Sequence, residues 1–185
     1  MSRESFIATY TEHITRPGAD KLLDWLGCTD FYDAPASTRF HGNHRGGLVE
    51  HSLAVWHELI RLLKAYPEVR VTAETAAIVS LLHDLCKIDC YKVELRNKKE
   101  NGVWHSVPTY VFEEDFKYGG HGSKSVYLIN KHMSLTDEEA VAINCHMGFS
   151  DRLPSDYSIG SAYEKYPLAW LLHVADEAAT FIGKV

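Results

Sequence analysis

The chain has few cysteines, and none of them are paired at the spacing of a zinc knuckle. Its four cysteines, Cys28, Cys86, Cys90 and Cys145, are scattered along the sequence. This distribution argues against a structural zinc site built on CxxC motifs and favours reduced, buried thiols. The 185 residues also contain no internal repeat, low-complexity tract or convincing linker. We therefore expect one domain over residues 1–185.

The sequence also lacks the features of a membrane or secreted protein. No apolar run approaches the length of a bilayer span. The first residues, Met1 to Ser5, are polar and lead into an amphipathic segment, which is unlike a signal peptide. We expect a cytoplasmic protein with no membrane partner.

An excess of basic residues is absent as well. The formal net charge is −6, with 45% hydrophobic and 24% charged residues, which are values of an ordinary globular protein. This balance does not indicate a nucleic-acid surface. A nucleotide in a metal-lined cleft stays open, because bound metals supply local positive charge.

Apolar residues recur at helical spacing over most of the chain. The pattern predicts helices at about 6–14, 20–26, 48–66, 72–84, 121–132, 137–147 and 167–176. Asp20 is a candidate cap of the second helix, and Thr136 to Glu139 form a capping box before the sixth. A loop containing Gly148, Pro154 and Gly160 is expected before the last helix.

One stretch departs from the helical period. Tyr91, Val93 and Leu95 alternate with charged residues, and a second β-like run follows the Asn101-Gly102 dipeptide. We interpret about 90–113 as a β-hairpin inserted into an all-α bundle. Its aromatic and basic residues are typical of a lid or specificity element, although a solvated turn is the simpler reading.

Five short stretches contain potential metal ligands. In chain order they are GGLVEHS (46–52), LHDLCK (82–87), GGHG (119–122), CHMG (145–148) and HVAD (173–176). His83 and Asp84 end an apolar run, where burying two ionisable groups is costly unless a metal or a partner offsets the cost. An ordered series of this kind on a helical scaffold indicates a metal-dependent hydrolase.

The residue types suit divalent metals, which take imidazole nitrogen and carboxylate oxygen at about 2.0–2.2 Å. A first metal position would take His51, His83, Asp84 and Asp176. A second would take His121 and His146, with Asp84 as a bridging carboxylate, and two metals roughly 3.5–4 Å apart suit in-line attack at phosphorus. The alternative for His121 and His146 is a bond to a backbone carbonyl at a helix end.

Other side chains are candidates for catalysis and substrate binding. Lys87 lies one helical turn beyond His83, so its ammonium could stabilise phosphoryl oxygens next to Asp84, or it is simply solvated. His41, His44 and Arg45 precede the first ligand helix and could reach a substrate phosphate, or they belong to an ordinary loop. His173, one turn before Asp176, is expected to pack beside the ligands.

The ligand series resembles the HD superfamily of metal-dependent phosphohydrolases, which share the order His…His-Asp…Asp. The resemblance covers about 40–182. The strings GGLVEHSL and LLHDLCK are similar to the branch that includes HD domains of bacterial 3′–5′ exoribonucleases and some conjugative relaxases. GGHG and CHMG are similar to the additional histidine positions of two-metal members, including the cyclic-dinucleotide phosphodiesterases.

The resemblance implies an HD-type helical bundle and both ligand sets given above. The chain departs from the family in three ways. Many two-metal relatives have consecutive histidines where this chain has His146-Met147, and the Gly-Tyr-Pro signature of the cyclic-di-GMP enzymes is missing. No nucleic-acid-binding module like that of the exoribonucleases precedes the ligand series.

These observations predict a metal-dependent phosphohydrolase that attacks a nucleotide or another small phosphate ester with metal-activated water. It would use one or two divalent ions, such as Mn, Fe, Ni, Co, Zn or Mg. One alternative is a phosphodiesterase or nuclease acting on a short or cyclic nucleic acid. Others are a non-catalytic metal- or nucleotide-binding regulator, or a helical interaction module that binds through the hairpin.

Overall fold

The chain is mostly helical, with a single hairpin among the residues that the structure describes. The structure is a computed structural model, and it describes residues 2–38, 42–114, 116, 118–151 and 158–183. Its α-helices are α1 (Ser2–His13), α2 (Ala19–Gly27), α3 (Gly47–Ala65), α4 (Ala73–Leu82), α5 (His121–Asn130), α6 (Asp137–Asn144), α7 (Ser158–Lys165) and α8 (Pro167–Phe181). Two short 3₁₀ helices are η1 (Leu85–Lys87) and η2 (Gly148–Asp151). The strands β1 (Tyr91–Glu100) and β2 (Val103–Phe112) form the hairpin.

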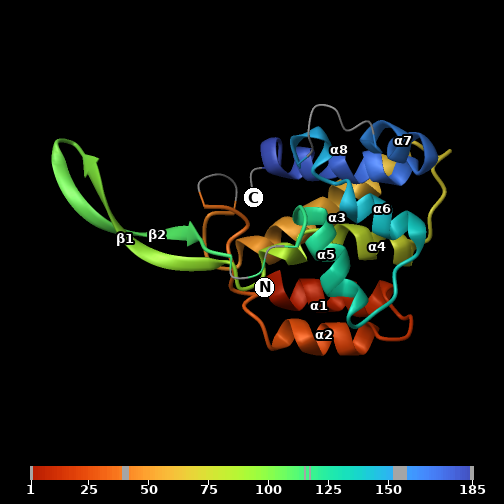
Figure 1. Cartoon of the computed structure of the whole chain (residues 1–185), viewed down its shortest axis with the longest axis horizontal. Helices are drawn as coiled ribbons and strands as arrows, with labels where there is room; N and C mark the ends of the chain where they lie inside the picture. Colours follow the sequence, from red (N-terminus) through yellow and green to blue (C-terminus); the bar gives the residue numbers. More distant parts are fainter. Residues whose placement is uncertain (1, 39–41, 115, 117, 152–157, 184–185) are drawn as a thin grey trace.

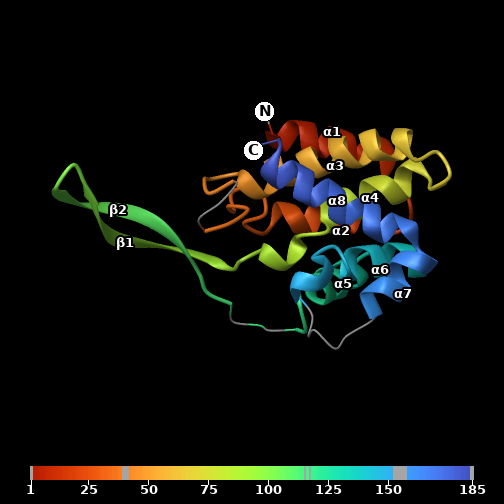
Figure 2. The same ribbon diagram turned by 90° about the horizontal axis from the view of Figure 1, so that it is seen from above.

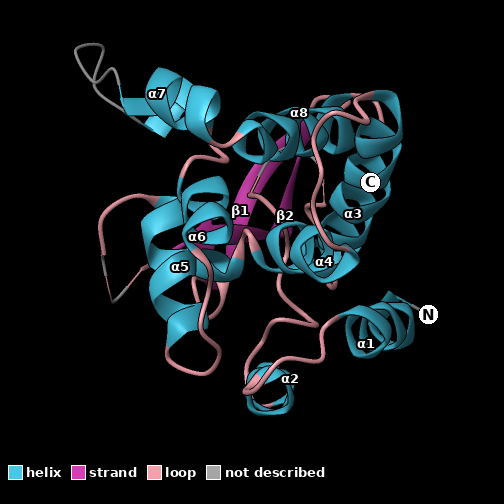
Figure 3. Cartoon of the chain, turned by 90° about the vertical axis from the view of Figure 1, so that its right-hand side faces the viewer, coloured by secondary structure: helices cyan, strands magenta, loops and turns pink. Residues whose placement is uncertain are grey.

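The long helix α3 is the centre of the helical body. It packs against α4 and α8, while α5 and α6 pack against each other and α6 also contacts α4 and α8. Helices α1 and α2 lie on one side of this group, and α7 lies on the opposite side, beside α8 (Figures 1, 2 and 3). Leu48, Leu59, Ile78 and Leu172 are fully buried core residues from three of these helices.

Capping residues define several helix starts as the sequence predicted. The Thr72 hydroxyl accepts a hydrogen bond from the Thr75 amide at 3.0 Å and begins α4. The capping box from Thr136 to Glu139 is present at α6, and Pro167 occupies the first turn of α8. Helices α4 and α6 therefore start where a side chain satisfies free amide groups, and α8 starts at a proline that has no amide hydrogen to satisfy.

Three sequence-based boundaries were wrong. The N-cap of α2 is Gly18 in a left-handed conformation (φ 93°), so Asp20 lies in the first turn instead. Helix α6 ends at Asn144, and His146 follows it, because the backbone leaves the α region at Cys145. Part of the loop predicted after Gly148 forms η2 and α7, and Ile159 of α7 is buried. The prediction treated Gly160 as a residue that ends a helix. One glycine inside a helix costs only about 1 kcal/mol, so α7 tolerates it.

The hairpin prediction is confirmed, and the hairpin extends away from the helical body as an arm (Figures 1 and 2). The strands pair in register from Tyr91 with Phe112 to Glu100 with Val103. Asn101 (φ 51°) and Gly102 (φ 84°) both adopt the positive φ values of a type I′ turn. Most residues of the arm are exposed, and Leu95 is 72% exposed.

A buried ion-pair network ties the segment after α1 to two other helices. The Arg16 guanidinium donates to both carboxylate oxygens of Glu139, at 2.7 and 2.8 Å, and to Glu74 at 3.2 Å. The Thr75 hydroxyl also donates to Glu139. Because Glu139 is fully buried, these bonds replace the hydration that its carboxylate loses on folding.

Within the described residues, no helix combines the length and the apolar character needed to cross a bilayer.

Candidate metal centre

Four segments of the chain bring five potential ligands together. His51 is in the second turn of α3, His83 and Asp84 follow α4, His146 follows α6, and Asp176 is on α8. Their ligand atoms form two groups in which every atom is within 4.8 Å of the others. One group is His51, His83 and Asp176, and the other is His83, Asp84 and His146. The structure therefore brings together five of the six metal ligands predicted from sequence.

The distances show how closely these groups converge. His51 Nε2 lies 3.0 Å from Asp176 Oδ1 and 3.6 Å from Asp84 Oδ2. His83 Nε2 lies 3.4 Å from Asp84 Oδ2, and His146 Nε2 lies 3.6 Å from Asp84 Oδ1. The two oxygens of Asp84 thus face different histidines. A carboxylate that bridges two ions needs this arrangement, because each of its oxygens binds one ion. An imidazole nitrogen has one lone pair and binds a single ion.

Backbone carbonyls fix two of the imidazole rings. His83 Nδ1 is 2.8 Å from the Ser80 carbonyl oxygen, and His146 Nδ1 is 2.7 Å from the Ile143 carbonyl oxygen. Since a carbonyl only accepts, Nδ1 donates in both rings, and the Nε2 atom of each neutral ring presents its lone pair to the cluster. Both Nε2 atoms are buried without a hydrogen-bond partner among the described residues.

The cluster is therefore a set of acceptors that a cation would satisfy. Imidazole lone pairs and carboxylate oxygens face one another at 3.4–3.6 Å in a buried space, which is costly without positive charge between them. Burial lowers the pKa of His83, but the carboxylates of Asp84 and Asp176 raise it more, so the net shift is upward. The same carboxylates that attract a proton to this ring would attract a metal ion. The donor set fits a divalent metal.

Lys87 gives the centre a fixed positive charge. Its Nζ atom lies 2.6 Å from Asp84 Oδ2, on the 3₁₀ turn that directly follows the His-Asp pair. Burial raises the pKa of Asp84, but the Lys87 ammonium and the His83 ring outweigh it, so the pKa of Asp84 lies well below its usual range. Asp84 is therefore ionised at neutral pH, and Lys87 is charged beside it.

Two glycines explain why the chain approaches itself so closely here. A side chain at Gly122 would meet the carbonyl oxygens of Ile143 and Asn144 at 2.5 Å, so glycine is required where α5 crosses the end of α6. Gly148 has a φ of 57°, and a Cβ atom there would meet the His173 ring at 2.8 Å. His173 Nδ1 in turn donates to the His146 carbonyl at 2.8 Å. His173 thus holds the backbone of a ligand, as expected from its place in the sequence.

The remaining predicted site residues that the structure describes belong to neither of the two ligand groups. His121 is in neither ligand group; it lines a cavity beside Lys87, and its role as a metal ligand stays a prediction. His44 is 2.8 Å from Glu50, and Arg45 donates to Asp33 at 2.9 Å, so each contacts a carboxylate. His41 lies outside the described residues.

Two cavities open beside the cluster and share Lys87 and Met147. One, of about 210 Å³, also contacts Asp84 and Asp176. The other, of about 460 Å³, reaches Tyr91 and Phe112 at the root of the hairpin. The sequence pattern predicts no role for Met147 or Phe112, because their positions beside the candidate metal centre depend on tertiary contacts.

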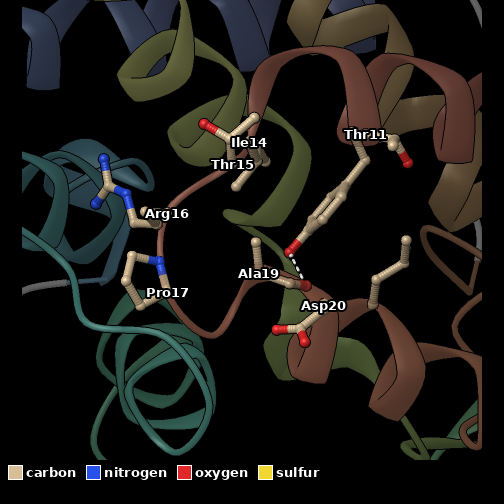
Figure 4. Close-up of a pocket in the computed structure, with 9 residues that line it drawn as sticks. Thr11, Ile14, Thr15, Arg16, Pro17, Ala19 and Asp20 are labelled. Atoms are coloured by element: carbon tan, nitrogen blue, oxygen red, sulfur yellow. Dashed lines mark hydrogen bonds between the residues drawn. The ribbon is translucent and has the colours of Figure 1, made fainter.

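A further groove, of about 500 Å³, lies between α1 and α2, away from the cluster (Figure 4). Its walls include Thr11, Asp20 and Tyr10, whose hydroxyl donates to the Ala19 carbonyl at 2.8 Å. Arg16 also lines this groove, but its guanidinium is engaged with Glu139 and Glu74. The smaller cavities at the cluster are therefore the better candidates for chemistry, despite the size of this groove.

Comparison with known proteins gives no family for the chain: no family model, curated protein or solved structure matches it.

Proposed function

We propose that this protein is a metal-dependent phosphohydrolase of the HD type, acting on a nucleotide or a similar phosphate ester. The observation that carries the proposal is the buried convergence of imidazole and carboxylate acceptors at the inner wall of a cavity. A structural metal site is normally closed by protein ligands, whereas a catalytic one keeps a position open to substrate. The cavity that contacts Asp84 and Asp176 supports the catalytic reading.

The residues of the site have three proposed roles: some bind the metal, some orient the metal ligands, and Lys87 stabilises negative charge on the substrate. His51, His83, His146, Asp84 and Asp176 would hold one or two divalent ions. The chemistry that such ions supply when bound is activation of water and polarisation of the phosphoryl group. The Ser80 and Ile143 carbonyls keep the rings of His83 and His146 oriented, so the ligands need little rearrangement.

Lys87 is proposed to stabilise the phosphoryl group. Lys87 lines both cavities beside the cluster, so a substrate that lies across them would contact its side chain. It is 14% exposed and held by Asp84, which orients its charge without burying it completely. A positioned ammonium offsets the negative charge that develops on phosphoryl oxygens during attack.

Hydrolysis of a phosphodiester is a second candidate reaction. The two oxygens of Asp84 face His83 and His146 respectively, which favours a two-metal arrangement of the kind used by many phosphodiesterases and nucleases. Monoester and diester substrates are therefore both included in the test.

The experiment is a panel of phosphate esters assayed with several divalent metals. The panel contains nucleoside mono- and triphosphates, cyclic nucleotides, short RNA and DNA, and p-nitrophenyl mono- and diesters. The protein is first stripped with a chelator and then loaded with Mn, Fe, Ni, Co, Zn or Mg. We expect turnover that disappears on stripping and returns with metal. Tight metal binding without turnover of any ester would contradict the proposal and leave a metal-binding regulator.

A further inference from the structure

The root of the hairpin forms one wall of the cavity next to Lys87. This cavity, of about 460 Å³, is within the size range of small-molecule sites, and its lining combines four apolar or aromatic residues with four polar or charged ones. Tyr91 and Phe112 are the first cross-strand pair of the hairpin, with ring centroids 5.7 Å apart at an interplanar angle of 75°. The arm thus begins with the Tyr91–Phe112 ring pair, which lies at the edge of the candidate metal centre.

The Tyr91 ring is anchored by a hydrogen bond, and the Phe112 ring is partly exposed to solvent. The Tyr91 hydroxyl donates to the Ala36 carbonyl at 3.4 Å, which anchors its ring to the loop before α3. Phe112 is 43% exposed and lines the cavity together with Met147. An aromatic ring and a flexible thioether that line one cavity offer a surface on which a flat ring can stack.

The charge of the cavity suits an anionic substrate. The chain carries a net charge of −6, yet none of the described residues that line this cavity is acidic, and Lys87 and His121 are among them. Ser37 and Thr38 add hydroxyl groups, which can bond to the polar edge of a base or to a ribose. The lining therefore combines a cation near the metal ligands, aromatic faces and a few polar groups.

Resting on the proposed function, we propose that this cavity is the nucleoside subsite of the enzyme. The phosphate lies at Lys87 beside Asp84, and the base stacks in the corner formed by Tyr91, Phe112 and Met147. The substrate class is accordingly a nucleotide, and the residues at the hairpin root determine specificity. An aliphatic phosphate would bury apolar surface here without the stacking contact of a flat ring, and a sugar phosphate would offer a smaller apolar face than a base does.

The test measures nucleoside binding separately from turnover. Saturation-transfer NMR with adenosine, guanosine, cytidine and uridine is recorded on the chelator-treated full-length protein, and affinities for the corresponding monophosphates follow by titration. Phe112→Leu keeps an apolar side chain but removes the ring, and Phe112→Ala removes both. The matched control is Trp104→Ala, because Trp104 is on the same strand and face, near the tip, and 66% exposed.

We expect saturation transfer to base protons in the wild-type protein. Loss of stacking in either Phe112 variant should weaken nucleotide binding roughly tenfold, whereas Trp104→Ala should stay within about twofold of wild type. Nucleoside binding without hydrolysis of any ester would support the subsite while contradicting the proposed enzyme.

Two results would overturn the subsite. One is hydrolysis of p-nitrophenyl esters with no nucleoside binding, which would leave the proposed enzyme intact. The other is n-octyl phosphate binding as tightly as the nucleotides with Phe112→Leu unchanged, which would identify an aliphatic substrate.

Discussion

The candidate metal cluster and the hairpin arm are separated by only a few residues, yet they are held in opposite ways. Asp84 is 3% exposed and faces side chains from several helices, so its position depends on the whole helical body. Leu95 is 72% exposed, and within the described part of the chain its strand pairs only with the other strand of the hairpin. A change in the cluster therefore acts on chemistry and stability together, whereas a change in the arm acts locally.

Replacement of Asp84 by alanine should have the largest effect. Asp84 faces His51, His83 and His146, so its loss removes a carboxylate from every proposed ligand position. We expect metal content and ester hydrolysis to be lost together, as measured by elemental analysis and turnover. Asp24→Ala, at an exposed carboxylate of α2, is the matched control and should change neither. Near-native turnover with metal retained in Asp84→Ala would disprove the site assignment.

His146→Ala and His121→Ala should differ in their effect on metal content. His146 belongs to a ligand group, so its replacement should remove about one metal equivalent while the group of His51, His83 and Asp176 keeps the other. His121 lies outside both groups, so we expect its replacement to cost less metal. Equal losses in both variants would identify His121 as the ligand that the sequence predicted.

Arg16→Ala should destabilise the body without touching the cluster. The Glu139 carboxylate would stay buried without its bidentate partner, and breaking a buried pair in this way costs about 3 kcal/mol. Urea denaturation followed by circular dichroism should show this decrease in the free energy of unfolding. A decrease of less than about 1 kcal/mol would mean that the network is solvated in solution.

The same network predicts how stability changes with pH. Burial raises the pKa of Glu139, but the bonds from Arg16, Thr136 and Thr75 outweigh it, so the folded pKa lies below the ordinary value of 4.5. A lowered folded pKa contributes stability above the unfolded pKa that is lost as the pH falls through the folded value. The wild type should therefore exceed Glu139→Gln in stability at pH 7 by more than at pH 3. A difference that does not vary with pH would contradict this assignment.

Shortening the arm should have the smallest effect. Deleting 97–100 and 103–106 joins the Arg96–Val107 pair directly to the Asn101-Gly102 turn and keeps the strand register. Because the deleted residues are exposed, we expect the melting temperature to change by no more than a few degrees and metal content to stay the same. Nucleotide affinity should also persist, since Tyr91 and Phe112 remain. Loss of folding or of oligomeric state would instead identify the tip as an interface.

Local signals in the sequence predicted much of this fold. The hairpin follows from alternation and the Asn101-Gly102 turn, and α4 and α6 start at capping residues, because such features depend on neighbours in the chain. Helix α7 was missed since Gly160 and the polar residues around it give a weak periodic pattern. The convergence of His51, His83, Asp84, His146 and Asp176 was expected from their residue types, and the structure brings them together.

The cavity walls are different, because they depend on contacts between distant segments. The meeting of Met147 with Phe112 requires the hairpin root to lie beside the end of α6, and no local pattern encodes that. The sequence suggested Trp104 and Tyr91 alike as aromatic residues for a substrate. Only the length and direction of the arm separate them, since one lies near the tip and the other at the root.

The contact between Lys87 and Asp84 has a consequence for how the protein would acquire the proposed metal. The lysine gives the central carboxylate a counter-charge that is part of the chain, so we expect the helical body to fold before an ion binds, although an ion would stabilise the cluster further. Under the proposed function, metal exchange would then proceed on a preformed scaffold, and occupancy would follow the supply of ions in the surroundings and their relative affinities for imidazole and carboxylate. The same polypeptide purified from different media would carry different metals, and its activity would report on metal availability as well as on substrate.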